Sequence, residues 1–349
     1  GLSHGYYLNM TDKMFTVNID VYYGLNFFQQ ALENIRNQTY SNLEIIISNN
    51  GALPEIQDFI KDQARADPRI QVINYQNNIY DSQDPELRTF IICNDALKKA
   101  QGDFFFYQSY DDLMALDYVE KIVQLFCEDD NCMSAAGLPI SIYGDNTIGE
   151  EELIDRKDNL RPRMMAGHEL ALDVVNNGDF FSAPGTIFAF RTEFLRRKGG
   201  FHRSIEMSQL YGMVPFGRTG FDDSAIFYWR RGDFQLNKIL GQSGYVGVKE
   251  LYDLLKDFDL YNRWLVFGEV NALKVIQYCK QSVCRDAAQN FLINITELRF
   301  KGVAKNLRVV FFKAYFWMAI PNTFWGGKKY FIYTLYQSIK NILLPRRKK

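Results

Sequence analysis

Residues 100–114 read AQGDFFFYQSYDDLM, and this stretch decides the fold. The run Phe104–Tyr107 is apolar and aromatic and too short for a helix, so it predicts a buried strand. Two adjacent carboxylates, Asp111 and Asp112, follow at the carboxyl end of that strand, where ligands bind in open α/β sheets. Hard divalent cations take carboxylate and phosphate oxygens together, so the stretch predicts a cation that bridges to a diphosphate. The alternative is that one of the two aspartates caps a helix over residues 116–128.

Strand and helix patterns alternate on both sides of this stretch. Short apolar or alternating runs predict strands, and apolar residues at helical spacing predict helices. The strands are predicted at residues 15–22, 43–48, 70–75, 133–143 and 183–190, and the helices at 27–36, 54–66 and 87–99, with one more that follows Asp222 and Asp223 and runs through Arg231. This alternation argues for a doubly wound α/β layer with a mostly parallel central sheet flanked by helices.

The length and composition fit a chain with one large domain or two smaller ones. The 349 residues include 28 Phe, 21 Tyr and 4 Trp, which supply an ample core. Turn-rich, charged sequence at 144–163 predicts a loop, and the helical pattern that begins near residue 248 marks a boundary. We predict an N-terminal extension at 1–13, an α/β domain at 14–240 and a helical region at 241–349.

Cysteine and histidine usage argues against a zinc site. The five cysteines form no CxxC pair, their number is odd, and the chain has only three histidines. Such thiols predict a reducing compartment. The N-terminus shows no secretory signal, so a cytoplasmic location is predicted.

The C-terminal region carries an excess of positive charge. Residues 301–349 contain eleven Lys or Arg and no acidic residue, whereas residues 1–300 hold 29 basic and 41 acidic side chains. Residues 328–349 combine an apolar stripe at helical spacing with this charge, which predicts an amphipathic helix on an anionic membrane surface. The alternative is that the stripe packs on the α/β domain and the basic end is solvated. Nucleic acid is not expected as a partner, because no base-reading motif accompanies the charge.

The order of the motifs resembles that of a family 2 glycosyltransferase with the GT-A fold. The resemblance covers about residues 14–235. It rests on Tyr22, on LENIRNQTYSNLEIIISNNGA at 32–52, on ALKKAQGDFFFYQSYDD at 96–112, and on the late Asp222-Asp223 pair. Each motif alone is weak, but four in the right order make the resemblance specific.

This resemblance implies roles for residues that bind a nucleotide-sugar donor. Tyr22 and Asn50 would border the nucleobase, with Asn50 where an aspartate usually accepts the uracil N–H, so UDP is the expected nucleotide. Ser109 stands where the first aspartate of the family's Asp-x-Asp motif lies and would contact the ribose. Asp111 would bind Mn²⁺ or Mg²⁺, and Asp112 would share that metal.

The resemblance also implies an enzyme that transfers the sugar with inversion. Asp223 matches the general base that takes the proton of the acceptor hydroxyl, and Asp222 would support it. The expected acceptor is a glycan or lipid-linked glycan in bacterial surface polysaccharide synthesis, at the inner face of the cell membrane. The alternative from another class is a catalytically weak GT-A-like module that binds a nucleotide or glycan and scaffolds partners at the membrane.

Overall fold

The computed structural model describes residues 12–80, 86–148, 161–177, 187–202, 208–231, 254–256 and 258–280. The chain divides after Gly232 into two compact units, residues 1–232 and 233–349, and each is described by itself. The predicted domain boundary at residue 240 lies outside the described residues.

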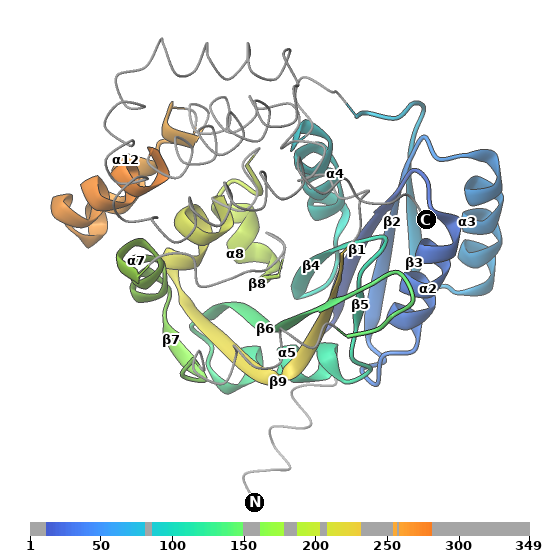
Figure 1. The fold of residues 1–349 in the computed structure, drawn as a ribbon, viewed down its shortest axis with the longest axis horizontal. Helices are drawn as coiled ribbons and strands as arrows, with labels where there is room; N and C mark the ends of the chain where they lie inside the picture. The colour runs from blue at the N-terminus through green and yellow to red at the C-terminus, as the bar shows by residue number, and fades with distance from the viewer. Residues whose placement is uncertain are drawn as a thin grey trace, which may run out of the picture. The chain divides into compact units, whose positions relative to one another are not determined.

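The described strands of the first unit form one nine-stranded mixed sheet in the order β3-β2-β1-β4-β8-β6-β9-β5, with β7 beside β9 (Figure 1). They are β1 (Phe15–Val21), β2 (Leu43–Asn50), β3 (Ile70–Tyr75), β4 (Phe104–Ser109), β5 (Leu113–Met114), β6 (Cys132–Ile142), β7 (Met164–Ala166), β8 (Ala189–Arg191) and β9 (Arg218–Arg230). The first four in chain order are parallel to one another. β8 then runs antiparallel between β4 and β6, and β9 runs parallel to β6.

Three helices connect the parallel strands β1 to β4, as crossovers between parallel strands require: α2 (Leu25–Arg36), α3 (Pro54–Ala66) and α4 (Glu86–Lys99). The other described helices of this unit are α5 (Tyr118–Glu128), α7 (Gly167–Asn177) and α8 (Thr192–Arg197), with the short turns η1 (Ser208–Met213) and η2 (Val214–Phe216) before β9. The predicted α/β class with a parallel centre is therefore confirmed, and the predicted strand over 133–143 matches β6.

The two faces of the central strands differ in chemistry. Odd-numbered residues of β1, such as Val17 and Ile19, share a buried apolar cluster with residues of α2, α3 and α5. Thr16, Asn18 and Asp20 alternate with them along the same strand. These buried polar residues point to the face on which α4 packs. β1 therefore carries polar side chains to the carboxyl edge of the sheet.

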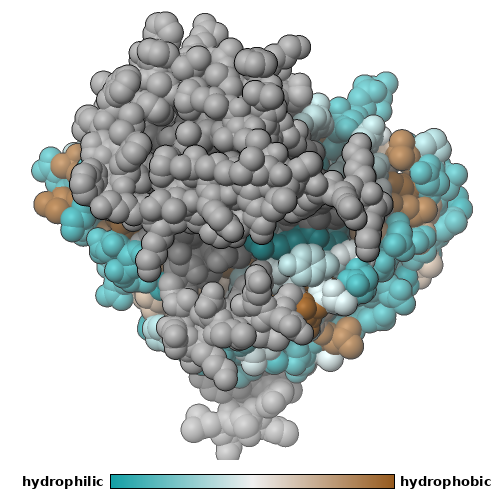
Figure 2. Space-filling view, viewed as in Figure 1, coloured by the Kyte–Doolittle hydropathy of each residue, from teal (hydrophilic) through white to brown (hydrophobic). Residues whose placement is uncertain are grey.

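The exposed side of α3 is polar. On the face shown in Figure 2, hydrophilic residues dominate the described surface around α3, and hydrophobic residues appear there in small separate groups. This agrees with the burial of α3, whose Ile56 and Ile60 face the core. The helix is amphipathic and needs no further partner on this side.

One predicted element is wrong. Residues after Asp222 and Asp223 were expected to form a helix through Arg231, but they continue the long strand β9. The stretch Ala225–Arg230 is rich in aromatic and β-branched residues, which suit a pleated surface. β9 pairs with β6 along most of its length and also with β5 and β7, and these pairings override the helical spacing.

The second unit is helical where it is described. Its elements are a helical segment at 254–256, α12 (Leu260–Trp264), η3 (Leu265–Phe267) and a helix over 269–280. Among the described residues, no helix has the length and apolar character needed to cross a bilayer. The predicted amphipathic helix at 328–349 lies outside the described residues. Among the described residues, Cys127, Cys132 and Cys279 are free thiols.

Candidate active site

Polar side chains meet where β1, β2 and β4 end at one edge of the sheet. In register, Asp20 of β1 lies beside Ser48 of β2 on one side and Ser109 of β4 on the other. The Tyr107 hydroxyl donates a hydrogen bond to Asp20 Oδ1 at 2.5 Å, and Arg88 Nε of α4 lies 3.8 Å from Asp20 Oδ2. Burial, together with the charge of Asp20, raises the pKa of Tyr107, so the phenol stays a donor. This arrangement orients the Asp20 carboxylate and the Arg88 guanidinium at the edge where β1, β2 and β4 end.

The acidic turn, residues 109–112, follows β4 directly. Ser109 Oγ donates a hydrogen bond to Asp111 Oδ1 at 2.5 Å, and the Asp112 N–H donates to the Ser109 carbonyl at 3.3 Å. Asp111 is buried, and this burial raises the pKa of its carboxyl, with a further rise from the charge of Asp20. A buried carboxylate beside a second negative charge favours a neighbouring cation. Ser109 and Asp111 thus lie together, and the roles expected for them in donor and metal binding stay predictions.

Asp112 has a different partner from the cation predicted for it. Its Oδ1 accepts the Arg230 N–H at 2.9 Å, and its own carbonyl accepts a hydrogen bond from Gln108 Nε2 at 2.7 Å. Burial, and then the charge of Asp111, raises the pKa of Asp112 well above its usual range. Its carboxylate therefore holds the end of β9 against the turn, and this geometry gives no support to a metal-ligand role.

The residues predicted to border the nucleobase lie at the ends of β1 and β2. Asn50 is buried; its Oδ1 accepts the Ile79 N–H and its Nδ2 donates to Asn78 Oδ1, both at 2.9 Å. Asn50 therefore organises the loop after β3. Tyr22 is half-buried, and its carbonyl accepts the Leu53 N–H at 3.2 Å.

Aromatic rings link the end of β1 to the acidic turn. Tyr22 packs edge-on against Tyr23 with ring centroids 6.0 Å apart, and Tyr23 packs against Tyr110 at 5.5 Å. Gly24 has φ +82° and a Cβ there would lie 2.7 Å from the Tyr110 ring. A glycine is required at this point because the left-handed backbone and the ring leave no room for a side chain.

The side chains at this edge that could coordinate a metal ion suit a cation that takes most of its ligands from a substrate. Among the described residues, no group of three or more His, Cys, Asp or Glu could hold a metal ion by itself. Mg²⁺-type sites commonly use one or two carboxylates, water and substrate phosphates. Asp111 suits the role of that single protein carboxylate, because it is buried, adjoins Asp20 and is fixed by Ser109.

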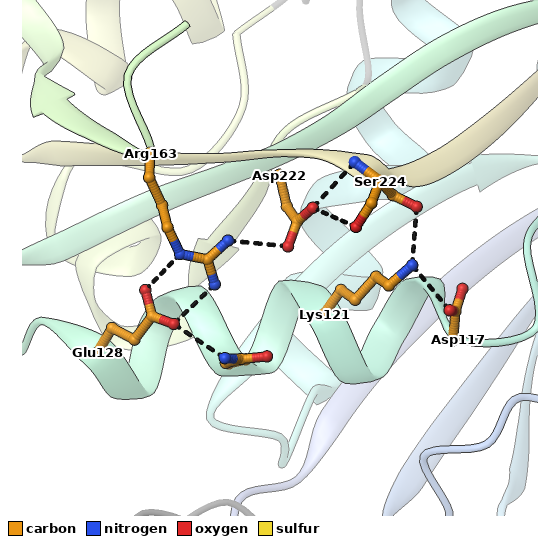
Figure 3. Close-up of polar contacts among 7 residues, drawn as sticks. Asp117, Lys121, Glu128, Arg163, Asp222 and Ser224 are labelled. Carbon is orange, nitrogen blue, oxygen red and sulfur yellow. Dashed lines mark hydrogen bonds and ion pairs between the residues drawn. The ribbon is translucent and has the colours of Figure 1, made fainter.

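Asp222 is engaged in an ion-pair network with α5 (Figure 3). Its carboxylate accepts hydrogen bonds from Arg163 Nη1 at 2.9 Å and from the N–H and Oγ of Ser224 at 2.9 and 2.6 Å. Arg163 also donates to both carboxylate oxygens of Glu128 at 2.6 and 2.8 Å. Burial acts to raise the pKa of Asp222, but the hydrogen bonds from Ser224 and Arg163 outweigh this effect and hold the pKa below its usual value. Asp222 therefore fastens β9 to the end of α5.

The structure does not bring Asp222 and Asp223 to Asp111. Asp222 pairs with Gly137 of β6, whereas Arg230, which touches the acidic turn, pairs with Ile142. Five residues of an extended strand span about 16 Å, so the two ends of β9 are well separated. Asp223 is exposed on the irregular segment between these pairings. The role of general base predicted for Asp223 thus rests on the sequence resemblance alone.

Four residues at this edge were not predicted, and two of them left a trace in the sequence. Asp20 is the last of three polar residues that alternate along a strand, and Tyr107 ends the aromatic run of β4. Arg88 and Arg230 gave no signal. Arg88 precedes Asp111 by 23 residues and Arg230 follows it by 119, and only the folded sheet brings them to the same edge.

Comparisons with known proteins identify the family of this chain. Residues 16–197 match glycosyl transferase family 2. The putative glycosyltransferase EpsH of Bacillus subtilis is 29% identical over 106 residues, which are 30% of this chain and 28% of that protein. The glycosyltransferase GlyA of Streptococcus pneumoniae is 27% identical over 119 residues, which are 34% of this chain and 16% of that protein. The chain thus spans less than a third of the length of either relative.

One solved structure of similar fold is the mannosyltransferase PcManGT of Pyrobaculum calidifontis, determined in complex with GDP-Man and Mn²⁺. It superimposes with a TM-score of 0.52 at 14% identity, over 95% of this chain and 88% of that one. The family match covers more than half of the chain. The chain therefore belongs to glycosyl transferase family 2, and the predictions of that family and of its GT-A fold are confirmed.

Proposed function

We propose that this chain transfers a sugar from a nucleotide diphosphate donor, expected to be a UDP-sugar, to a hydroxyl of a glycan or lipid-linked glycan. The observation that carries the proposal is the acidic turn at the end of β4, with buried Asp111 fixed by Ser109 beside Asp20. This edge of the sheet is where ligands bind in the α/β class. The setting we propose is bacterial surface polysaccharide synthesis, as a hexosyltransferase.

The chain's own residues would place the donor as follows. Asp111 would hold Mn²⁺ or Mg²⁺ against the diphosphate, and Ser109 would face the ribose. Tyr22 and the loop held by Asn50 would border the base. The cation, when bound, would neutralise the charge that develops on the departing diphosphate. Arg88, held beside Asp20, adds a positive charge at the same edge.

The proton of the acceptor hydroxyl needs a carboxylate within hydrogen-bond reach. We propose that this carboxylate is not Asp223, because Asp223 lies on the exposed, irregular segment of β9, near the network of Asp222 with α5. Asp222 has a structural role in the same proposal, since Arg163 and Ser224 occupy its oxygens.

The test is a panel of nucleotide sugars incubated with the chain and Mn²⁺, with release of the nucleoside diphosphate as the readout. We expect one donor to be hydrolysed or transferred, and we expect Asp111→Asn to lower that rate by at least about tenfold, since even the loss of a partner that only orients a metal ligand commonly costs 10–100-fold. The control is Asp130→Asn, which removes an exposed carboxylate after α5. A variant Asp111→Asn with wild-type turnover would contradict the proposal.

A second candidate function has its own support. Ser109 stands where the family's motif usually has an aspartate, and the side-chain amide of Asn50 is hydrogen-bonded to protein groups. Both features suit a module that binds a nucleotide or glycan without turning it over. The panel separates the two. Saturable binding of a nucleotide sugar with no release of diphosphate from any donor would favour the binding module.

A further inference from the structure

Arg230 ends β9 directly against the acidic turn. Its side chain is almost completely buried, with 1% of the residue exposed. Its Nε donates a hydrogen bond to the Asp111 carbonyl at 2.7 Å, and its main-chain N–H donates to Asp112 Oδ1 at 2.9 Å. One residue thus holds the main chain of Asp111 and the carboxylate of Asp112.

The same guanidinium reaches two further elements. Its Nη1 donates to the Tyr143 carbonyl at 2.9 Å, just beyond the end of β6. Its carbon lies 4.7 Å from the centre of the Phe27 ring in the first turn of α2, a cation–π distance. Residues 143–147 form a tight turn at this point, in which the Tyr143 N–H donates to the Thr147 carbonyl at 3.0 Å. Arg230 therefore connects the acidic turn, the turn after β6 and α2.

A buried arginine is costly unless its charge and donors are satisfied. Here the compensation comes from the acidic turn. Burial lowers the pKa of Arg230, and the charges of Asp111 and Asp112 oppose that change. In return, the positive charge favours the ionised forms of both aspartates. A planar guanidinium can reach several acceptors at fixed angles at once, which lysine cannot.

We propose that Arg230 is a positioning residue, which fixes the main chain of Asp111 so that its carboxylate meets the donor's cation and diphosphate, and which couples that carboxylate to the turn at Tyr143. The inference rests on the proposed function, and it concerns a residue that does not itself touch the donor. Residues that orient a metal ligand without contacting the metal commonly contribute 10–100-fold to metal affinity or activity.

The test compares Arg230→Met and Arg230→Lys with the wild-type chain in binding of UDP and GDP in the presence of Mn²⁺, by calorimetry. We expect Arg230→Met to bind the preferred nucleotide at least about tenfold more weakly, because an outer-shell partner is lost. Arg230→Lys should fall between the two, at about threefold, since lysine keeps the charge but not the fork of donors. Binding of the same nucleotides without Mn²⁺ should change by less than about twofold, because that binding does not need an oriented Asp111.

The matched control is Arg231→Met, one residue further along. The Arg231 guanidinium lies over the Trp229 ring at 4.7 Å. We expect this variant to bind as the wild type does. Circular dichroism and a melting curve accompany each variant, so that binding is measured on folded protein.

The outcomes separate the inference from the proposed function. If the wild-type chain binds no nucleotide with Mn²⁺, the proposed function fails. If the wild type binds and folded Arg230→Met binds equally well, only the positioning role is overturned. Should Arg230→Met not fold, Arg230→Lys decides: a wild-type dissociation constant in that variant contradicts the inference, and a Mn²⁺-dependent weakening supports it.

Discussion

Asp111 shows how much of a site depends on what surrounds a single side chain. Its carboxylate is buried, accepts a hydrogen bond from Ser109 and feels the charge of Asp20 from the neighbouring strand. Asp112, the next residue, is also buried, but its oxygen is taken by the Arg230 N–H. Two adjacent aspartates of one motif therefore have different roles, because the backbone of the turn directs their side chains to different partners.

The residue-scale prediction concerns Asp223. Its side chain is exposed on the irregular part of β9, so Asp223→Asn should change turnover of the preferred nucleotide sugar by less than about twofold, as is usual for surface substitutions. Loss of a general base would instead cost about 10²–10⁴-fold. Steady-state rates at saturating donor and acceptor decide, with Asp111→Asn measured beside it as the inactive reference. A large loss of turnover in Asp223→Asn with nucleotide binding intact would restore Asp223 as the base.

At the scale of the residue, the sequence identified the acidic turn but not the groups that hold it. Ser109, Asp111 and Asp112 are contiguous, and their position after an aromatic run is visible in the sequence. Arg230 lies 119 residues away from Asp111, and no local pattern marks it. Contacts between distant segments depend on strand order, which a single sequence does not encode locally.

At the scale of the element, β9 is the informative failure. Its aromatic residues satisfied a helical spacing, yet the strand is stabilised by β6, β5 and β7 together. The same pairing creates an irregularity: the register shifts between Gly137 and Leu138 of β6, where β9 bulges at residues 223–225. A bulge of this kind needs a neighbour without a side chain where the two backbones approach closely.

That close approach gives a prediction for Gly137. A Cβ built there would lie 2.1 Å from the Ala225 carbonyl oxygen and 2.6 Å from the Tyr118 ring. Gly137→Ala should therefore lower the free energy of unfolding by about 1–3 kcal/mol, the usual cost of overpacking. Urea unfolding measures it. Gly144→Ala is the control, because a Cβ at Gly144 meets no atom within 4 Å. Equal midpoints for the two variants would show that β6 and β9 lie further apart than described here.

The network of Asp222 gives a prediction that depends on pH. Asp222→Asn should cost about 1–2 kcal/mol at pH 7, because the amide cannot accept from both Arg163 and Ser224 and leaves a donor facing the guanidinium. The pKa of Asp222 is lower in the folded chain than in the unfolded chain, where it is about 3.9. Its contribution is therefore present above about pH 4 and is lost as the pH falls through the folded value.

The measurement is the difference in unfolding free energy between the wild type and Asp222→Asn, from pH 7 down to pH 3. We expect the difference to stay constant down to about pH 4 and to become smaller below it. Asp130→Asn, at an exposed position after α5, corrects for the change in net charge. A difference that stays constant across this range would mean that Asp222 is not held ionised by Arg163.

At the scale of the whole molecule, the parallel centre of the sheet followed from the sequence because each of its strands is a local apolar run between helical patterns. β1, β2, β3 and β4 lie where they were predicted, within a few residues. The mixed part of the sheet could not be predicted in this way. β8 is antiparallel to both of its neighbours, and β9 pairs with β6 in parallel. Their arrangement therefore depends on pairing between segments far apart in the sequence.

The last prediction concerns the basic C-terminal region, whose eleven Lys or Arg in residues 301–349 have no acidic counterpart. We propose that this region binds the chain to an anionic membrane at its inner face, where a lipid-linked acceptor would be elongated. Each basic residue near such a surface contributes about 1 kcal/mol, and this attraction is screened by salt. The full chain should therefore co-sediment with vesicles that contain phosphatidylserine at low salt and dissociate as the salt rises.

Two variants separate charge from apolar contact in this prediction. A chain that ends at Asn306 should lose vesicle binding altogether, since it lacks nine of the eleven basic residues of 301–349 and the apolar stripe. A full chain with Gln at positions 346–349 keeps the stripe and loses four positive charges, so its affinity should fall by about 10²-fold if even three of them act at the surface. Neutral phosphatidylcholine vesicles are the reference. If the full and shortened chains bind anionic vesicles equally, the attraction lies in residues 1–306, where acidic side chains are in excess. The proposal that the basic C-terminal region binds the membrane would then be wrong.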